Sequence, residues 1–385
     1  MRPDEAEQDA LPRQGPVRPE VVLSGLARAL VLLEATENVR SFALPYPSEA
    51  QWALDRVVML SLLAEEDPPL GLADLLVWAR TRPLEEWPAG VVPGYESGTE
   101  TLLDPRSGRP TDLCHEWAWH APGAPEDLHH LVLREARKRC SGLGDSTAFL
   151  AFHTLLVRRP VLTAAELYDV TGDLLLEPLW SLLTEIYQPA SDLHVRAGAY
   201  AVCERCGILL TPLDGDLWWC ERAGCPGDVG RVLERDQTGR PFQLQRPLRQ
   251  FVTGPGVIET ALRNMLVTSM PGVNVDPHLD PVGDLPGLSV TFPDGGDRWD
   301  VRVRDWAQPH LLAAALPEEA WTGHPDTTFW VVPDRRIEAR EDYVRAFRAA
   351  SPGRTGPALM STGELMRRIA ERVDGMRRGA LDAGP

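Results

Sequence analysis

The chain has 385 residues, of which 43% are apolar and 25% charged, a size and composition typical of two or three globular domains. Its formal net charge of −17 argues against a protein that coats nucleic acid irrespective of sequence, because phosphate binding needs a positive surface. No run approaches the roughly 18 apolar residues of a membrane span, and the start MRPDEAEQDALPRQGP is acidic and proline-rich, unlike a signal peptide. We therefore expect a cytoplasmic protein without a membrane span, with a disordered tail over residues 1–19.

The charge is unevenly distributed along the chain. Residues 241–385 contain 17 arginines and 19 acidic residues, a balance of −2, whereas residues 1–240 carry the other −15. The C-terminal third is therefore the part that can approach DNA most easily. Lys138 is the single lysine of the chain, so the C-terminal third contains none.

Residues 20–195 are expected to form a helical N-terminal region. VVLSGLARALVLLEA, PSEAQWALDRVVMLSLLAEE and GLADLLVWARTRPLEEW space their apolar residues as helices do, whereas residues 88–125 are rich in Gly, Pro and Asp. STAFLAFHTLLVRRPVLTAAELYDV then predicts a helix, a proline turn and a helix capped at Thr163. A winged-helix-like DNA reader has this order, but no basic recognition face follows, which favours an ordinary helical bundle.

Four cysteines in CERCGILLTPLDGDLWWCERAGC predict a zinc ribbon over residues 196–235. Cys203 and Cys206 bracket two residues, a spacer of 13 follows, and Cys220 and Cys225 bracket four. Four thiolates suit a tetrahedral Zn²⁺ site with no open position, so the metal would be structural. Two disulfides, or a knuckle that has lost its metal, are the alternatives, and a cytoplasmic location disfavours disulfides. Such a ribbon can contact DNA, hold a partner, or only brace the next domain.

Two other features of the sequence have plainer interpretations. Cys114, His115 and His120 in CHEWAWH lack a fourth ligand, which disfavours a second metal site. The tryptophans are expected to be packing anchors and not platforms for stacking bases; they are Trp117, Trp119, Trp218, Trp219 and Trp306.

Residues 246–385 predict a compact α/β domain. A helix (PGVIETALRNMLVTS) leads to a short strand near VNV, the strand LSVTF, a PDGG turn and the strand RWDVRVR. A helix from about residue 308, the strand TTFWVVP, the helix EDYVRAFRAA, the strand PALM and the capped helix STGELMRRIAERV follow. The order is helix, three strands, helix, strand, helix, strand, helix.

The strand in DRWDVRVRDW raises the question of catalysis. Its alternation places Asp300, Arg302 and Arg304 on one face and Trp299, Val301 and Val303 on the other. An acid and a cation two residues apart are what a metal-dependent nuclease uses, although the cation there is lysine. The strand is therefore an altered active site, the remains of one, or a solvated face.

The α/β order resembles the PD-(D/E)xK nuclease core, a restriction-endonuclease-like fold. The segments FVTGPGVIETALRNML, LSVTFPDGGDRWDVRVRDWAQPHLLA and FWVVPDRRIEAREDYVRAFR look like the endonuclease-like protein of prokaryotic PIWI-RE gene islands. The resemblance implies a role in defence against invading DNA, beside a PIWI-type Argonaute relative and a helicase. In the nuclease family, a helix acid and two strand acids hold Mg²⁺ or Mn²⁺, which polarises the phosphate and activates water.

The resemblance assigns site residues with clear departures from the family. Glu259 matches the helix acid, while the acid before the second strand falls on Gly287, with Asp284 the nearest acid. The acid-x-lysine pair falls on Arg302 and Arg304, or, shifted by two residues, on Asp300 and Arg302. Arginine is a poor water activator and repels a metal at an acid position.

The expected fold is therefore a helical N-terminal region, a four-cysteine zinc ribbon and a C-terminal restriction-endonuclease-like α/β domain. The first hypothesis is a nuclease-like subunit of a PIWI-RE island with a degenerate, weak or inactive site. The alternative is a non-enzymatic adaptor that binds DNA, the PIWI-like protein or the helicase. Arg298, Arg302 and Arg304 either contact DNA phosphates or are neutralised by Asp300 and Asp305.

Overall fold

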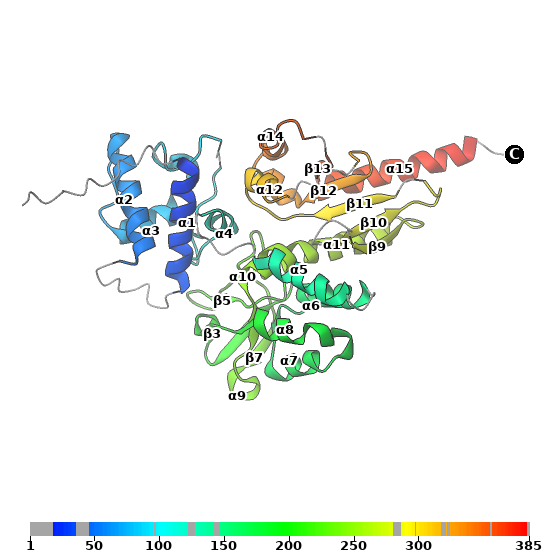
Figure 1. The fold of residues 1–385 in the computed structure, drawn as a ribbon, viewed down its shortest axis with the longest axis horizontal. Helices are drawn as coiled ribbons and strands as arrows, with labels where there is room; N and C mark the ends of the chain where they lie inside the picture. The colour runs from blue at the N-terminus through cyan, green and yellow to red at the C-terminus, as the bar shows by residue number, and fades with distance from the viewer. Residues whose placement is uncertain are drawn as a thin grey trace, which may run out of the picture.

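The computed structural model describes residues 18–35, 46–95, 98–121, 128–141, 146–279, 286–296, 298–316, 321, 324–354 and 356–382. Asp284, one of the predicted metal-facing acids, lies outside these ranges. Figure 1 shows a helical unit at the N-terminal end, a central unit, and a sheet-containing unit at the C-terminal end. Within the described residues, no helix has the length and apolar character needed to span a bilayer.

The N-terminal unit is a helical cluster around α1. It comprises α1 (Pro19–Ala35), α2 (Ser48–Leu63), α3 (Leu72–Thr81), η1 (Leu84–Glu86) and α4 (Asp112–Trp119). Leu23 and Leu26 of α1 are fully buried among these helices. A Cβ at Gly25 would lie 2.2 Å from the Trp52 ring, so glycine there lets α2 pack closely on α1. The side chain of Thr111 accepts a hydrogen bond from the Cys114 N–H and caps α4.

The central unit combines helices with a three-stranded antiparallel sheet of order β1-β8-β2. Its elements are α5 (Leu128–Ser141), α6 (Ser146–Arg158), β1 (Val161–Leu162), α7 (Ala164–Thr171), η2 (Leu174–Leu179), α8 (Trp180–Ile186), β2 (Tyr187–Pro189) and β8 (Phe242–Leu244). Thr163 and Glu166 form the capping box that starts α7, as the sequence predicts for Thr163. The elements follow one another as in a winged helix, in the order α6, β1, α7, α8, β2 and β8, with β8 in the middle of the sheet. The central unit is therefore not the simple helical bundle that the sequence favours.

The four-cysteine unit is inserted between β2 and β8, where a winged helix has its wing loop. It comprises η3 (Asp192–His194), β3 (Val195–Arg196), β4 (Ala199–Cys203), β5 (Thr211–Pro212), β6 (Trp218–Trp219), β7 (Val229–Glu234) and α9 (Arg235–Thr238). β3, β4 and β7 form one antiparallel sheet, and β5 and β6 form a hairpin. Two small apolar clusters stabilise this unit, and one of them contains the buried Tyr200.

The C-terminal unit has the predicted order of elements. A continuous helical stretch of α10 (Arg246–Leu248), the π-helix η4 (Arg249–Thr253) and α11 (Gly254–Ser269) leads into a five-stranded sheet of order β13-β12-β11-β10-β9. The strands and remaining helices are β9 (Asn274–Leu279), β10 (Pro286–Thr291), β11 (Trp299–Val303), α12 (Pro309–Ala315), β12 (Thr328–Val332), α13 (Asp334–Ala339), α14 (Tyr343–Ala349), β13 (Ala358–Ser361) and α15 (Thr362–Asp382). β9, β10 and β11 are antiparallel, whereas β11, β12 and β13 are parallel. The predicted multidomain fold with a C-terminal restriction-endonuclease-like domain is confirmed.

The two faces of this sheet pack against different helices. Leu288, Val301 and Val303 share an apolar cluster with Leu262 and Leu266 of α11 and with residues of α15. Alternate residues point to the other face, where Trp330 and Val332 pack with α12 and α14. A side chain on β11 therefore faces either α11 or α12, depending only on its parity.

Candidate metal and nuclease sites

The four predicted cysteines converge on one point. The Sγ atoms of Cys203, Cys206, Cys220 and Cys225 all lie within 4.8 Å of one another. The structure brings them together from β4, from the end of β6 and from the two turns between the strands. In the part of the chain that the structure describes, they are the single group of three or more His, Cys, Asp or Glu side chains arranged to hold a metal.

Glycine turns shape both cysteine knuckles. Gly207 has φ +68° and its N–H donates to the Cys203 carbonyl at 2.9 Å, which closes the first knuckle. Gly224 has φ +71°, and the Cys225 N–H donates to the Arg222 carbonyl at 3.1 Å in the second. Left-handed backbone at these two positions explains why glycine accompanies each cysteine pair.

The sulfur spacing fits tetrahedral metal coordination. The Sγ of Cys225 lies 3.5 Å from that of Cys203 and 3.6 Å from that of Cys206, and all four cysteines are unbridged. A disulfide requires about 2.05 Å, whereas sulfurs about 2.3 Å from one central ion lie roughly 3.8 Å apart. The hydrogen bond from Cys206 helps to lower the pKa of Cys203 to about 7, which favours the thiolate that a metal binds. The cluster can therefore hold a metal such as zinc.

Cys114 and His115 do not belong to a second metal site. Both side chains are buried in the helical unit, and the Cys114 thiol contacts the Ala27 carbonyl at 3.7 Å. Burial raises the pKa of Cys114, as expected for a thiol that packs as an apolar group.

Glu259 lies at one end of the C-terminal sheet. It is in the second turn of α11, half-buried, beside a cavity of about 90 Å³ that His153 of α6 and Pro286 and Leu288 of β10 also line. Burial raises the pKa of Glu259 to about 8, although Arg304 opposes this rise. Its carboxyl group therefore keeps its proton to a higher pH than an exposed glutamate does.

The remaining predicted catalytic residues face other surroundings. Asp300 and Arg302 alternate with Val301, which packs toward α11, so they project from the opposite face of the sheet. The Arg302 guanidinium lies 5.5 Å from the centre of the Trp330 ring. Arg304 follows the last residue of β11 and lies 4.9 Å from the same ring, and its charge also acts on Glu259. Glu259 and Asp300 are thus not gathered at one place, and their catalytic roles remain a prediction.

The strand register leaves no room for a side chain at Gly287. Leu288 pairs with Val301, which places Gly287 opposite Arg302. A Cβ at Gly287 would lie 2.6 Å from the Val301 carbonyl oxygen, so no aspartate fits there unless the backbone shifts. The strand pairing does not decide between the two alignments, so the assignment of the acid and lysine positions stays a prediction.

The two acids expected to neutralise the strand arginines have different partners. Asp300 pairs with Arg298 at 3.0 Å. Asp305 accepts from Arg222 at 2.9 Å, from Arg336 at 2.8 Å and from Arg335, none of which lies on β11. The direction of the chain changes after Val303, and Asp305 turns into the molecule.

Asp305 belongs to a buried ionic network that joins the three units. The side chain of Arg336 is 3% exposed and also reaches Asp112 of α4 at 3.0 Å, and Asp112 accepts from Arg246 at 2.8 Å. Arg222 comes from the second cysteine knuckle, so helical unit, ribbon and sheet domain share one network. This network was not predicted from the sequence. Its one local sign was the charged pair of Glu221 and Arg222 between Cys220 and Gly224.

Comparisons with known families agree with this architecture. The family model described as pPIWI_RE three-gene island domain Y matches residues 22–163, and the one described as REase associating with pPIWI_RE matches residues 256–377. No curated protein and no solved structure matches the chain. Both families belong to the same gene island, and one match lies toward each end of the chain. The cysteine cluster lies between the two matched ranges. The chain therefore belongs to the restriction-endonuclease-like proteins of the PIWI-RE three-gene island.

Proposed function

We propose that the chain acts on invading DNA as the nuclease-like subunit of its island, with a phosphodiesterase site that is degenerate and does not cleave. The observation that carries this proposal is the set of side chains around Glu259. The strand residues on its side of the sheet are apolar, namely Pro286, Leu288 and Val303. Among the described residues that line this cavity, Glu259 is the one acid, and a single carboxylate is a poor ligand set for Mg²⁺ or Mn²⁺, which need several oxygen donors.

The substituted cations support the same proposal. One alignment of the resemblance places Arg302 and Arg304 at the acid and lysine positions, and the other places Arg302 at the lysine position. Both guanidinium groups lie over Trp330. A planar, permanently charged guanidinium stabilises phosphate but does not accept a proton from water. If a metal were bound, it would supply Lewis-acid activation of the phosphate, and Glu259 would be its one ligand from α11.

A cleavage assay tests the proposal. Plasmid and single-stranded DNA are incubated with Mg²⁺ or Mn²⁺ and wild-type protein, Glu259→Ala or Asp300→Ala, with the PIWI-RE protein and helicase present in a second series. We expect no difference among the three proteins. Metal-dependent cleavage by the wild type that is lost in Glu259→Ala would overturn the proposal.

For the cysteine cluster, we propose Zn²⁺ as the bound ion, in a structural role. All four positions of a tetrahedron would be filled by Cys203, Cys206, Cys220 and Cys225, which leaves none for water or substrate. The network from Arg222 into the sheet domain supports a ribbon that braces its neighbours in the cytoplasmic complex.

The second candidate function is a non-enzymatic adaptor for the PIWI-like protein and the helicase. The winged-helix order of the central unit favours it, because α7, η2 and α8 contain no arginine or lysine and expose Tyr168, Leu174 and Glu177. An apolar and acidic surface suits a protein partner better than DNA. Salt separates the two functions: DNA binding should weaken steeply with salt, whereas docking through apolar contacts should change little.

A further inference from the structure

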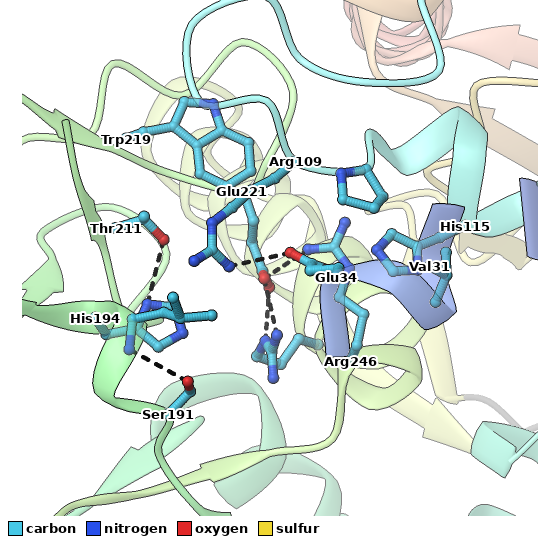
Figure 2. A pocket seen from close by; sticks show the side chains of 13 residues that line it. Val31, Glu34, Arg109, His115, Ser191, His194, Thr211, Trp219, Glu221 and Arg246 are labelled. Atoms are coloured by element: carbon cyan, nitrogen blue, oxygen red, sulfur yellow. Dashed lines mark hydrogen bonds and ion pairs between the residues drawn. The ribbon is translucent and has the colours of Figure 1, made fainter. Parts of the chain in front are cut away.

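A cavity of about 340 Å³ lies between the helical unit, the ribbon and the segment that enters the C-terminal domain (Figure 2). Glu34 and Arg109 line it from the helical unit, Thr211 and Trp219 from the ribbon, and Arg249 from the segment. Its volume falls in the range of small-molecule pockets, which frequently lie where structural units meet. It is separate from the Glu259 cavity and from the four cysteines.

Three arginines and two glutamates make the lining both charged and nearly balanced. Glu221 pairs with Arg246 at 2.7 Å and with Arg249 at 2.6 Å, and Glu34 pairs with Arg109 at 3.0 Å. The lining carries one more positive than negative group, which suits an anionic ligand.

Two buried histidines add neutral donors and acceptors to the same cavity (Figure 2). Burial, followed by the charge of Arg109, lowers the pKa of His194 to about 4, and burial lowers that of His115 well below its usual value. The His194 Nδ1 lies 3.2 Å from the Leu210 carbonyl oxygen and 3.3 Å from the Thr211 hydroxyl oxygen.

We infer that this cavity binds a phosphorylated ligand of mononucleotide size. Its phosphate oxygens would accept hydrogen bonds from the guanidinium groups, and its base would lie against the half-buried Trp219. Gathering so many buried polar side chains around a cavity costs stability, and binding such a ligand offsets that cost. The inference does not depend on whether the nuclease-like domain cleaves DNA.

Titration calorimetry of the full-length, zinc-loaded protein tests the inference with adenosine 5′-monophosphate, adenosine and inorganic phosphate. We expect the monophosphate to bind and adenosine to bind at least about tenfold more weakly, because the charged contacts are lost. A free nucleotide and the end of a strand share this chemistry. An oligodeoxynucleotide with a 5′-phosphate, compared with the same strand carrying a 5′-hydroxyl, shows which of the two sources binds.

Two variants and a matched control locate the binding. Arg109→Ala and Trp219→Leu should each weaken binding about tenfold or more, whereas Arg106→Ala should not, because Arg106 is exposed and lines a different cavity. Circular dichroism checks that each variant folds, and Trp219→Leu decides the matter if Arg109→Ala does not. Absence of binding by the monophosphate, phosphate and the phosphorylated strand at about 5 mM would overturn the inference. So would affinities unchanged in both variants.

Discussion

Replacing Asp305 by asparagine should strongly destabilise the chain. The Asp305 side chain is 5% exposed and accepts from Arg222 at 2.9 Å, from Arg336 at 2.8 Å and from Arg335. Asparagine keeps the shape but removes the charge, which leaves three guanidinium groups around a neutral amide. Breaking a buried pair costs about 3–5 kcal/mol, and because the amide oxygen still accepts one hydrogen bond we expect about 3 kcal/mol.

Urea unfolding followed by circular dichroism and tryptophan fluorescence measures this loss of unfolding free energy. The matched control is Asp300→Asn, because Asp300 pairs with an Arg298 side chain that is 47% exposed, and such pairs contribute less than about 1 kcal/mol. A double-mutant cycle with Arg222→Met should give a coupling of about 1–3 kcal/mol. Equal effects of Asp305→Asn and Asp300→Asn, or a coupling near zero, would refute the network argument.

The same network, the half-buried acid and the cysteines give further predictions. Burial alone would raise the pKa of Asp305, but its arginines hold it well below the usual value. The stabilisation by Asp305 is therefore present above about pH 4 and is lost as the pH falls further. In urea unfolding, the unfolding free energies of wild type and Asp305→Asn should converge in acid. For Glu259 the pH dependence has the opposite sign, because its pKa of about 8 exceeds the unfolded value and the unfolding free energy therefore falls between about pH 4.5 and 8. Glu259→Gln should be more stable than wild type by about 2–5 kcal/mol at pH 9 but not at pH 4. Equal unfolding curves of the two proteins at both pH values would contradict this. Elemental analysis should find about one zinc per chain, which the control Cys140→Ser should retain and Cys220→Ser should lose. The ribbon of Cys220→Ser should also become sensitive to protease. Zinc retained by Cys220→Ser would exclude the four-cysteine site.

The order of the C-terminal elements could be predicted because each carries its own local signal. LSVTF and RWDVRVR alternate with period two, and the helices that follow show the helical period. Both kinds of element can therefore be recognised without knowing which distant residues they pack against. The cysteine spacing is likewise a local signal, and the knuckle glycines follow directly from the turns that the cysteines need.

The site could be predicted only in part, because its arrangement depends on contacts between distant residues. Alternation separates the two faces of β11, but it does not tell which face meets α11; only the packing of Val301 with Leu262 decides that Asp300 points away from Glu259. The pairing of Arg222 with Asp305 joins residues 83 positions apart, and no local pattern encodes it. The winged-helix order was hidden because the ribbon separates β2 from β8 in the sequence.

The position of Asp305 favours a scaffold over an active site at this end of the sheet. An acid that binds a metal must keep its oxygens available, and arginines close enough to donate to both oxygens compete with the cation for them. At Asp305 both oxygens accept from arginines, which come from the ribbon and from the start of α13. Here the acid that follows β11 is used to fix the ribbon and the helical unit to the sheet domain, and the cations on the strand lie over Trp330. Under the proposed function, a chain that uses these charges for its own cohesion would hold partners or DNA in a fixed geometry.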